Sequence, residues 1–165
     1  MLRLADAKFL AGCSGMVLDY AAREPFWRRN LNYNHGTGHG VGYLGNIHEA
    51  PIGFRWKATR DAMCEIEPGM VITDEPGIYI EGSHGIRIEN ELLVRAGEKN
   101  EYGQFLYFEP LTFVPIDLDA LRPELMTEEE KQLLNAYHQS VYEKISPYLE
   151  AEEKEWLKEY TRPVK

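Results

Sequence analysis

The sequence has no long apolar run, few cysteines and no excess of basic residues. No stretch approaches the roughly 20 apolar residues that a membrane-spanning helix needs, so we expect no contact with a membrane. The opening MLRLADAKFL lacks the basic start and apolar stretch of a signal peptide, which leads us to expect a cytoplasmic protein. Cys13 and Cys64 stand apart without CxxC partners, and two distant cysteines do not make a disulfide framework.

Charge excludes further classes of partner. Lys and Arg number 18 against 27 Asp and Glu, which gives a net charge of −9. Nucleic acids and anionic lipids bind basic surfaces, so we expect neither as a partner. The length of 165 residues fits one domain or a substantial piece of a larger one.

The composition and the spacing of apolar residues change along the chain. Residues 1–31 have apolar positions near helical spacing and predict helix, with Gly12 and Gly15 breaking the first turns. Residues 32–58 are too rich in glycine for a stable helix. Short β-type runs follow in residues 59–116. The fold class that this pattern predicts is α/β with a helical tail.

The tail carries its own helix signals. Thr127-Glu128-Glu129-Glu130 resembles a capping box, because the N-cap threonine is followed three residues later by a glutamate. Apolar residues then recur at helical spacing up to Pro147, and a second helix is predicted over roughly 148–160.

Three of the five histidines lie in one glycine-rich stretch, HGTGHGVG followed by HE. His35 and His39 are four residues apart, as in a helical zinc pair, but the glycines between and after them argue against a helix. Glycines suit a loop that passes close to a bound group, with neutral imidazoles offered to a metal or a substrate. His48 would belong to the same loop. The alternative is a flexible loop with solvated histidines.

A hairpin brings two glutamates together. If its loop is centred on Gly82, Glu75 lies opposite Glu89. Two carboxylates in this position repel unless a positive group lies between them. Arg87, on the face of Glu89, would neutralise them in part, and a divalent cation would do so better. The alternative is an edge hairpin with exposed glutamates, but the apolar β-forming flanks favour the metal.

In order, HGTGHGVG, HEAP, TDEPGIY and GIRIEN resemble the metallopeptidases of the pita-bread fold, specifically the aminopeptidase P and prolidase branch. The later FEPLTFVPID, NAYH, ISPYL and TRPV resemble the C-terminal extension of cytosolic-type aminopeptidase P. The resemblance therefore implies the C-terminal half of a pita-bread catalytic domain over residues 1–116. A helical extension would occupy residues 117–165.

The resemblance implies three metal ligands, which are His39, Glu75 and Glu89. In this family two divalent ions, typically manganese, share a bridging hydroxide that attacks the carbonyl before proline. Cobalt or zinc would suit the same donors. The family has five protein ligands, and Asp6 and Asp19 lack the strand context of the two upstream aspartates. We therefore expect a C-terminal fragment of a longer enzyme, with an incomplete metal site and no activity of its own.

Catalytic and substrate-binding roles also follow from the resemblance. His35 and His48 would contact substrate and stabilise the developing oxyanion. Glu75 would carry a proton to the leaving nitrogen, and Arg87 would organise the acidic site. Independently of the resemblance, the position of Tyr79 on the face of Glu75 leads us to expect that it lines the substrate pocket.

The predicted function is release of the N-terminal residue from peptides with proline in second position. We expect the full-length enzyme to be a homodimer. Two alternatives remain, a prolidase-like Xaa-Pro dipeptidase and a non-catalytic binding module of the same fold. The retained histidine and glutamates argue against the binding module, because such a module has no need of two opposed carboxylates.

Overall fold

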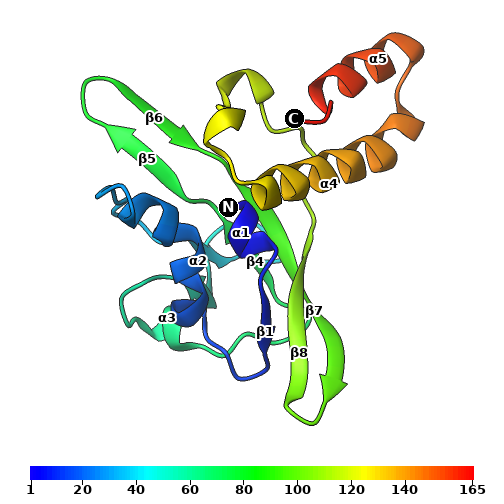
Figure 1. Cartoon of the computed structure of the whole chain (residues 1–165). Coiled ribbons are helices and arrows are strands. Elements are labelled where there is room, and N and C mark those ends of the chain that lie inside the picture. The colour runs from blue at the N-terminus through cyan, green and yellow to red at the C-terminus, as the bar shows by residue number, and fades with distance from the viewer. The chain divides into compact units, whose positions relative to one another are not determined.

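The computed structural model in Figure 1 describes residues 1–165 as two compact units. The first unit comprises Met1 and Arg3–Leu111, and the second comprises Leu2 and Thr112–Lys165. The domain boundary predicted between residues 116 and 117 stays a prediction. The elements are mixed α and β, as the sequence pattern predicts.

The first unit is built on an antiparallel six-stranded sheet with the strand order β1-β8-β7-β4-β2-β3. Its strands are β1 (Lys8–Leu10), β2 (Gly38–Gly40), β3 (Glu49–Phe54), β4 (Val71–Asp74), β7 (Asn90–Asn100) and β8 (Gly103–Pro110). A separate hairpin consists of β5 (Gly77–Ile80) and β6 (His84–Arg87). The helices are α1 (Leu2–Ala5), α2 (Gly15–Trp27) and α3 (Arg60–Met63).

The prediction of helix throughout residues 1–31 is wrong in part, because strand β1 separates two helices. Lys8, Phe9 and Leu10 alternate exposed, buried and exposed, and β1 pairs with β8. Gly12 then turns the chain with a φ of 91°, which glycine adopts at low cost. Pairing with a strand far along the chain therefore overrides the local helical spacing.

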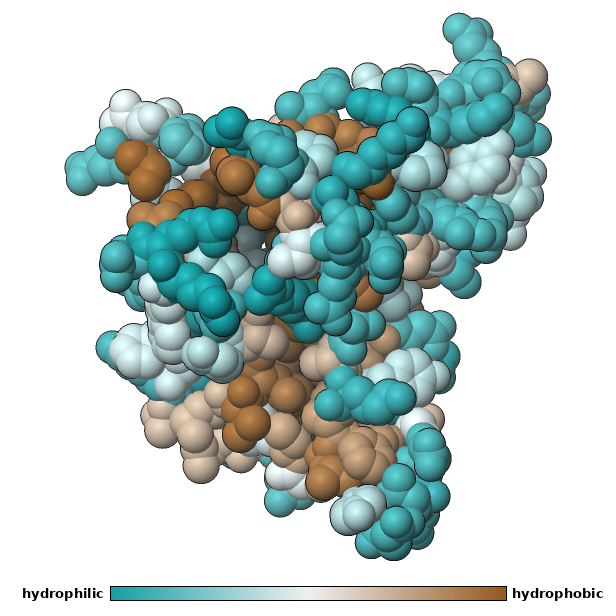
Figure 2. All heavy atoms as spheres, viewed as in Figure 1, coloured by the Kyte–Doolittle hydropathy of each residue, from teal (hydrophilic) through white to brown (hydrophobic).

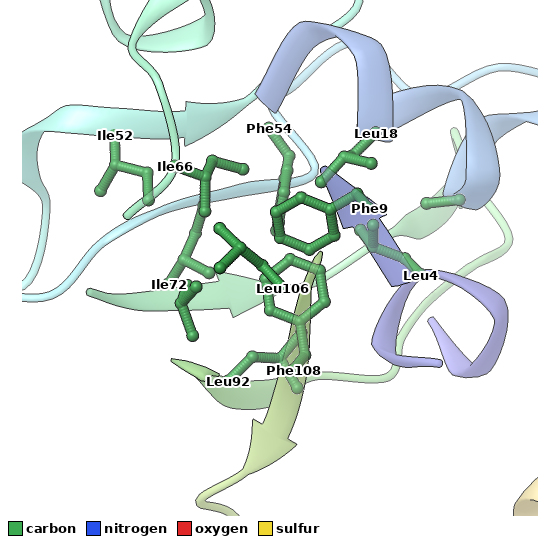
Figure 3. Close-up of a cluster of buried hydrophobic side chains, with 12 residues drawn as sticks. Leu4, Phe9, Leu18, Ile52, Phe54, Ile66, Ile72, Leu92, Leu106 and Phe108 are labelled. Atoms are coloured by element: carbon green, nitrogen blue, oxygen red, sulfur yellow. The ribbon is translucent and has the colours of Figure 1, made fainter. Parts of the chain in front are cut away.

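The core of the first unit joins the sheet to α1 and α2 (Figure 3). The Phe108 ring lies 5.0 Å from that of Phe9 and 5.8 Å from that of Phe54, measured between centroids. Aliphatic side chains complete the cluster, among them Leu4, Leu18, Ile52, Ile66, Ile72, Leu92 and Leu106.

The predicted hairpin register is confirmed. Partners in the β5–β6 hairpin are symmetric about Gly82, as in Gly77↔Arg87. The β4–β7 pairing keeps the same symmetry, as in Asp74↔Asn90. Glu75 and Glu89 lie in the interruption between these two ladders. They therefore do not form the cross-strand pair that the sequence predicts. Both side chains consequently lie at a break in the hydrogen-bonded ribbon.

Close backbone packing explains why the histidine loop alternates with glycine. A methyl group on Gly38 would stand 1.8 Å from the carbonyl oxygen of Thr73. A methyl group on Gly40 would stand 2.3 Å from the carbonyl oxygen of Glu49. Only glycine lets β2 fit between β4 and β3 at these distances, which places His39 on the strand next to the β3 edge of the sheet.

The β5–β6 hairpin extends from the sheet and exposes apolar side chains. Its brown atoms are visible at the upper left of Figure 2. Ile80 and Ile86 are 43% and 50% exposed, respectively.

The second unit contains two helices, α4 (Glu128–Ile145) and α5 (Ala151–Tyr160). The predicted capping box is confirmed, since Thr127 and Glu130 exchange both side-chain-to-backbone hydrogen bonds. The second helix begins later than predicted because Ser146–Tyr148, which contains Pro147, forms a 3₁₀ turn. Two further 3₁₀ turns span Leu118–Ala120 and Pro123–Leu125. None of the helices in the protein is both long and apolar enough to span a membrane.

His138 is the buried histidine of the second unit. Its Nε2 accepts a hydrogen bond from the Ile116 backbone N–H at 3.0 Å, and its Nδ1 has no partner. Because Nε2 accepts, the ring must be neutral with its proton on Nδ1. Burial lowers the pKa of His138 below its ordinary value.

We predict that His138 makes the second unit sensitive to acid. The unfolded chain takes up a proton on His138 near pH 6.5, whereas the folded unit resists it because its pKa is lower. Above about pH 6.5 His138 is neutral in both states and does not lower the free energy of unfolding. That free energy decreases as the pH falls from 6.5 to the lower pKa of the folded unit. Urea unfolding at pH 7.5 and 5.5 should show the decrease in wild type and a smaller one in His138→Gln. An equal decrease in both proteins would contradict the prediction.

Candidate active site

A buried ion pair on α2 anchors the start of the histidine loop. The Arg23 Nε lies 2.7 Å from Asp19 Oδ2, and both side chains are almost wholly buried. The same guanidinium donates to the carbonyl oxygens of Tyr33 at 2.8 Å and of His35 at 2.7 Å. Its Cζ also lies 3.9 Å from the centre of the Tyr33 ring. The chain entering the loop is therefore fixed by charge-assisted hydrogen bonds.

Thr37 connects this network to the segment between β4 and β5 that carries Glu75. Its hydroxyl donates to Asp19, and its backbone oxygen accepts from the Glu75 N–H at 2.7 Å. Its own N–H donates to the Phe54 carbonyl at 2.8 Å. Thr37 thus joins α2, β3 and the TDEPG segment.

Two histidines of the loop share one tautomer. The Nδ1 of His35 lies 2.7 Å from the Gly36 carbonyl oxygen, and that of His39 lies 2.9 Å from the Gly40 carbonyl oxygen. A carbonyl only accepts, so each Nδ1 carries a proton, and in the neutral ring Nε2 keeps its lone pair. The Nε2 of His35 is buried and has no partner.

The Nε2 of His39 faces a carboxylate. It lies 3.1 Å from Glu75 Oε1, which also accepts a hydrogen bond from the Thr73 hydroxyl at 3.1 Å. A neutral imidazole with its proton on Nδ1 and an ionised carboxylate are both acceptors at this contact. A proton or a metal ion between them relieves the repulsion, and such a nitrogen and oxygen pair is typical of a divalent metal site.

Arg87 lies between the two glutamates, as the sequence predicts. Its Nε is 3.4 Å from Glu89 Oε2 and 4.0 Å from Glu75 Oε2. Its Nη1 donates to the Tyr79 hydroxyl at 3.3 Å. The hydrogen bond to Tyr79 and the charge of Glu89 raise the pKa of Arg87, so the guanidinium stays charged.

These groups surround one open pocket of about 620 Å³. Six of the seven predicted site residues line it: His35, His39, His48, Glu75, Tyr79 and Arg87. Glu89 does not line the pocket, although it contacts Arg87. No group of three or more His, Cys, Asp or Glu side chains is arranged to hold a metal ion. The structure therefore brings together one pair of the predicted ligands, and Glu89 stands apart.

The residue before Glu75, Asp74, places a carboxyl group without hydrogen-bond partners beside the site. It is completely buried, and neither carboxyl oxygen has a partner. Burial raises the pKa of Asp74 to about 7, against the opposing attraction of the Met1 ammonium. Asp19, Glu75 and Glu89 raise it further by repulsion. Asp74 therefore holds its proton more readily than an exposed aspartate does.

Comparison with known proteins decides the family. The profile of metallopeptidase family M24 matches residues 1–96, which is more than half of the chain. The chain belongs to metallopeptidase family M24. Residues 104–164 of this M24 chain also match the C-terminal region of the peptidase family.

Relatives of this M24 chain are named as Xaa-Pro peptidases. A probable Xaa-Pro aminopeptidase P of Talaromyces marneffei is 44% identical over 172 residues, covering 100% of this chain and 26% of the relative. The structure of a Caenorhabditis elegans X-prolyl aminopeptidase, described as cytosolic with a di-nuclear active site, matches with a TM-score of 0.89 and 37% identity. That match covers 99% of this chain and 27% of the nematode chain. An Xaa-Pro dipeptidase from Bacillus anthracis matches with a TM-score of 0.53 and 34% identity, over 71% of this chain and 29% of its own.

These matches confirm the resemblance to aminopeptidase P and the pita-bread fold class of the M24 chain. The chain spans about a quarter of the length of the relatives named above, as their coverage shows.

Sequence reasoning missed the side chains that position this site. The sequence context of Asp19 indicates only that it is a poor metal ligand, and the structure places it in the ion pair with Arg23. Their separation by four residues on a predicted helix is a signal that could have indicated the pair. Arg55 and Asp61 also line the pocket, and no motif singles them out.

Proposed function

We propose that this M24 chain carries part of the active site of an enzyme that releases the N-terminal residue from peptides with proline in second position. The observation that supports the proposal best is the contact of His39 Nε2 with Glu75 Oε1 at 3.1 Å, inside the pocket. The names of the relatives supply the reaction.

In this proposal His39, Glu75 and Glu89 hold divalent metal. One imidazole and two carboxylates suit manganese, with cobalt or zinc as alternatives, and we propose manganese. The di-nuclear site of the nematode enzyme supports two ions. When bound, the ions would supply Lewis-acid polarisation of the scissile carbonyl and activation of the attacking water.

The remaining residues act on the peptide. The buried Nε2 of His35 and the ring of His48, which lies 4.1 Å from the His39 ring, would contact the substrate and stabilise its developing oxyanion. Tyr79 would line the substrate side of the pocket, and Arg87 would orient Glu75. The Glu75 carboxylate would carry a proton to the leaving nitrogen of proline.

The matched lengths favour aminopeptidase P over a prolidase-like dipeptidase. The aminopeptidase P structure matches 99% of this chain, whereas the dipeptidase structure matches 71%. We propose that the full-length enzyme is a cytoplasmic homodimer that cleaves peptides beginning Xaa-Pro. The nematode relative is described as cytosolic, which supports the location.

We further propose that the isolated 165-residue chain binds metal weakly and does not turn over substrate. The supporting observation is that only His39 and Glu75 of the proposed ligands meet in the pocket. A metal ion with few protein ligands dissociates readily, and an unfixed ion does not orient the substrate.

The test is calorimetric titration of the purified chain with manganese, together with an assay for alanine release from Ala-Pro-Ala. We expect weak binding and no release of alanine. Two tightly bound ions per chain, or robust manganese-dependent cleavage, would show that the site is complete. Weak binding or no detectable binding at millimolar manganese would support an incomplete site that needs further ligands.

A further inference from the structure

Arg55 places a guanidinium in the candidate pocket, and the proposed function gives this group no role. It follows strand β3 directly, is half-buried and lines the pocket together with His35, His39 and Glu75. A methyl group built on Gly36 would stand 2.9 Å from both Cζ and Nη1 of Arg55. The guanidinium therefore lies against the backbone next to His35, where the loop glycine leaves room for it.

The Arg55 guanidinium has no ion-pair or hydrogen-bond partner in the protein. The other arginine of the pocket differs, since Arg87 is engaged by Glu75, Glu89 and Tyr79. Glu49 and Asp61 also line the pocket, but neither forms an ion pair with Arg55. Arg55 is thus the free cation of a pocket whose other charged groups are mostly acidic.

A planar guanidinium presents a fork of N–H donors that matches the two oxygens of a carboxylate. A peptide without acidic side chains has one such group, its C-terminal carboxylate. An aspartate or glutamate beyond the proline would present the same chemistry. The N-terminal ammonium repels a guanidinium, and a peptide carbonyl offers it one neutral acceptor instead of two charged oxygens.

We propose that Arg55 is a specificity-determining residue that binds a carboxylate of the peptide in the pocket. The inference rests on the proposed function for the identity of the ligand as a peptide. Arg55 would draw the part of the peptide beyond proline toward β3, next to the residues that face the scissile bond. The site would then prefer peptides that are short or acidic beyond the proline.

The experiment measures peptide binding by the metal-free chain, with nuclear magnetic resonance of the ¹⁵N-labelled protein. The probes are Ala-Pro-Ala as free acid, Ala-Pro-Ala amide and Ala-Pro-Asp amide. The variants are Arg55→Gln, Arg55→Lys and the control Arg60→Gln, which removes the same charge from an exposed position outside the pocket. The Arg55 Nε–H resonance is assigned by its absence from Arg55→Gln.

We expect wild type to bind at least one carboxylate peptide about tenfold more tightly than Ala-Pro-Ala amide, with a shift of the Arg55 resonance. Arg55→Gln should abolish this preference, Arg55→Lys should keep part of it, and Arg60→Gln should keep all of it. A preference for the tripeptide acid alone identifies the C-terminal carboxylate as the ligand. A preference for the aspartyl amide alone identifies the acidic side chain.

Equal affinity of wild type for acid and amide peptides would overturn the inference, as would a preference that survives in Arg55→Gln. If no peptide binds, the proposed peptide pocket fails, and titration with glutarate decides the role of Arg55 separately. A glutarate-induced shift of the Arg55 Nε–H resonance supports a carboxylate site at Arg55, and an unchanged resonance refutes it.

Discussion

Replacing Arg23 with alanine should lower the free energy of unfolding of the first unit by about 3–5 kcal/mol, the usual cost of removing one partner of a buried ion pair. The Asp19 carboxylate would stay buried without its cation. The carbonyl oxygens of Tyr33 and His35 would lose charged donors at the same time. Urea unfolding followed by amide resonances of the sheet measures the loss.

Arg28→Ala is the matched control, because Arg28 pairs with Glu24 on the same helix but its side chain is 75% exposed. Glu24 keeps its ion pair with Arg3 in this variant, and the exposed arginine contributes only about 0–1 kcal/mol, so the control should unfold almost as wild type does. The double replacement Asp19→Leu with Arg23→Met should recover part of the loss, since it removes both buried charges. If Arg23→Ala is no less stable than Arg28→Ala, the ion pair does not anchor the histidine loop.

The second large effect concerns metal. Glu75→Gln should weaken manganese binding by at least about 100-fold, because loss of a group that merely orients a ligand already costs about 10–100-fold. A glutamine amide can donate to the free Nε2 of His39, so the loop should keep its structure. Broadening of the His39 resonances by paramagnetic manganese detects binding even when it is weak.

Glu81→Gln is the control for Glu75→Gln. It removes the same charge from the exposed hairpin loop and should leave the broadening unchanged. Broadening in Glu75→Gln at the same manganese concentration as in wild type would refute the role of Glu75 as a ligand. Equal loss in both variants would mean that net charge, rather than coordination, attracts the ion.

Features that depend on local chemistry were predictable from the sequence. The capping box of α4 needs only Thr127 and Glu130, and the hairpin register needs only Gly82 and the β-type runs around it. The resemblance of the motifs to a known family was enough to assign six residues that the structure brings to one pocket.

Features that depend on distant partners were not predictable. Strand β1 exists because β8, almost a hundred positions later, pairs with it. The ion pair of Asp19 with Arg23 fixes the histidine loop through the carbonyl oxygens of Tyr33 and His35, and no motif marks that contact. Arg55 belongs to no motif, and its lack of a partner becomes visible only when its neighbours are known.

The β5–β6 and β4–β7 pairings are both symmetric about Gly82, and this symmetry limits how related chains can differ in length. The arm beyond the break can gain or lose residues in matched pairs, such as Ile80 with His84, without moving Glu75 or Glu89. A single insertion on one side would shift one strand by a residue and turn its side chains to the opposite face. Natural length variation in this arm should therefore occur in steps that preserve the pairing on the sheet side, and the tip should be the part most free to diverge.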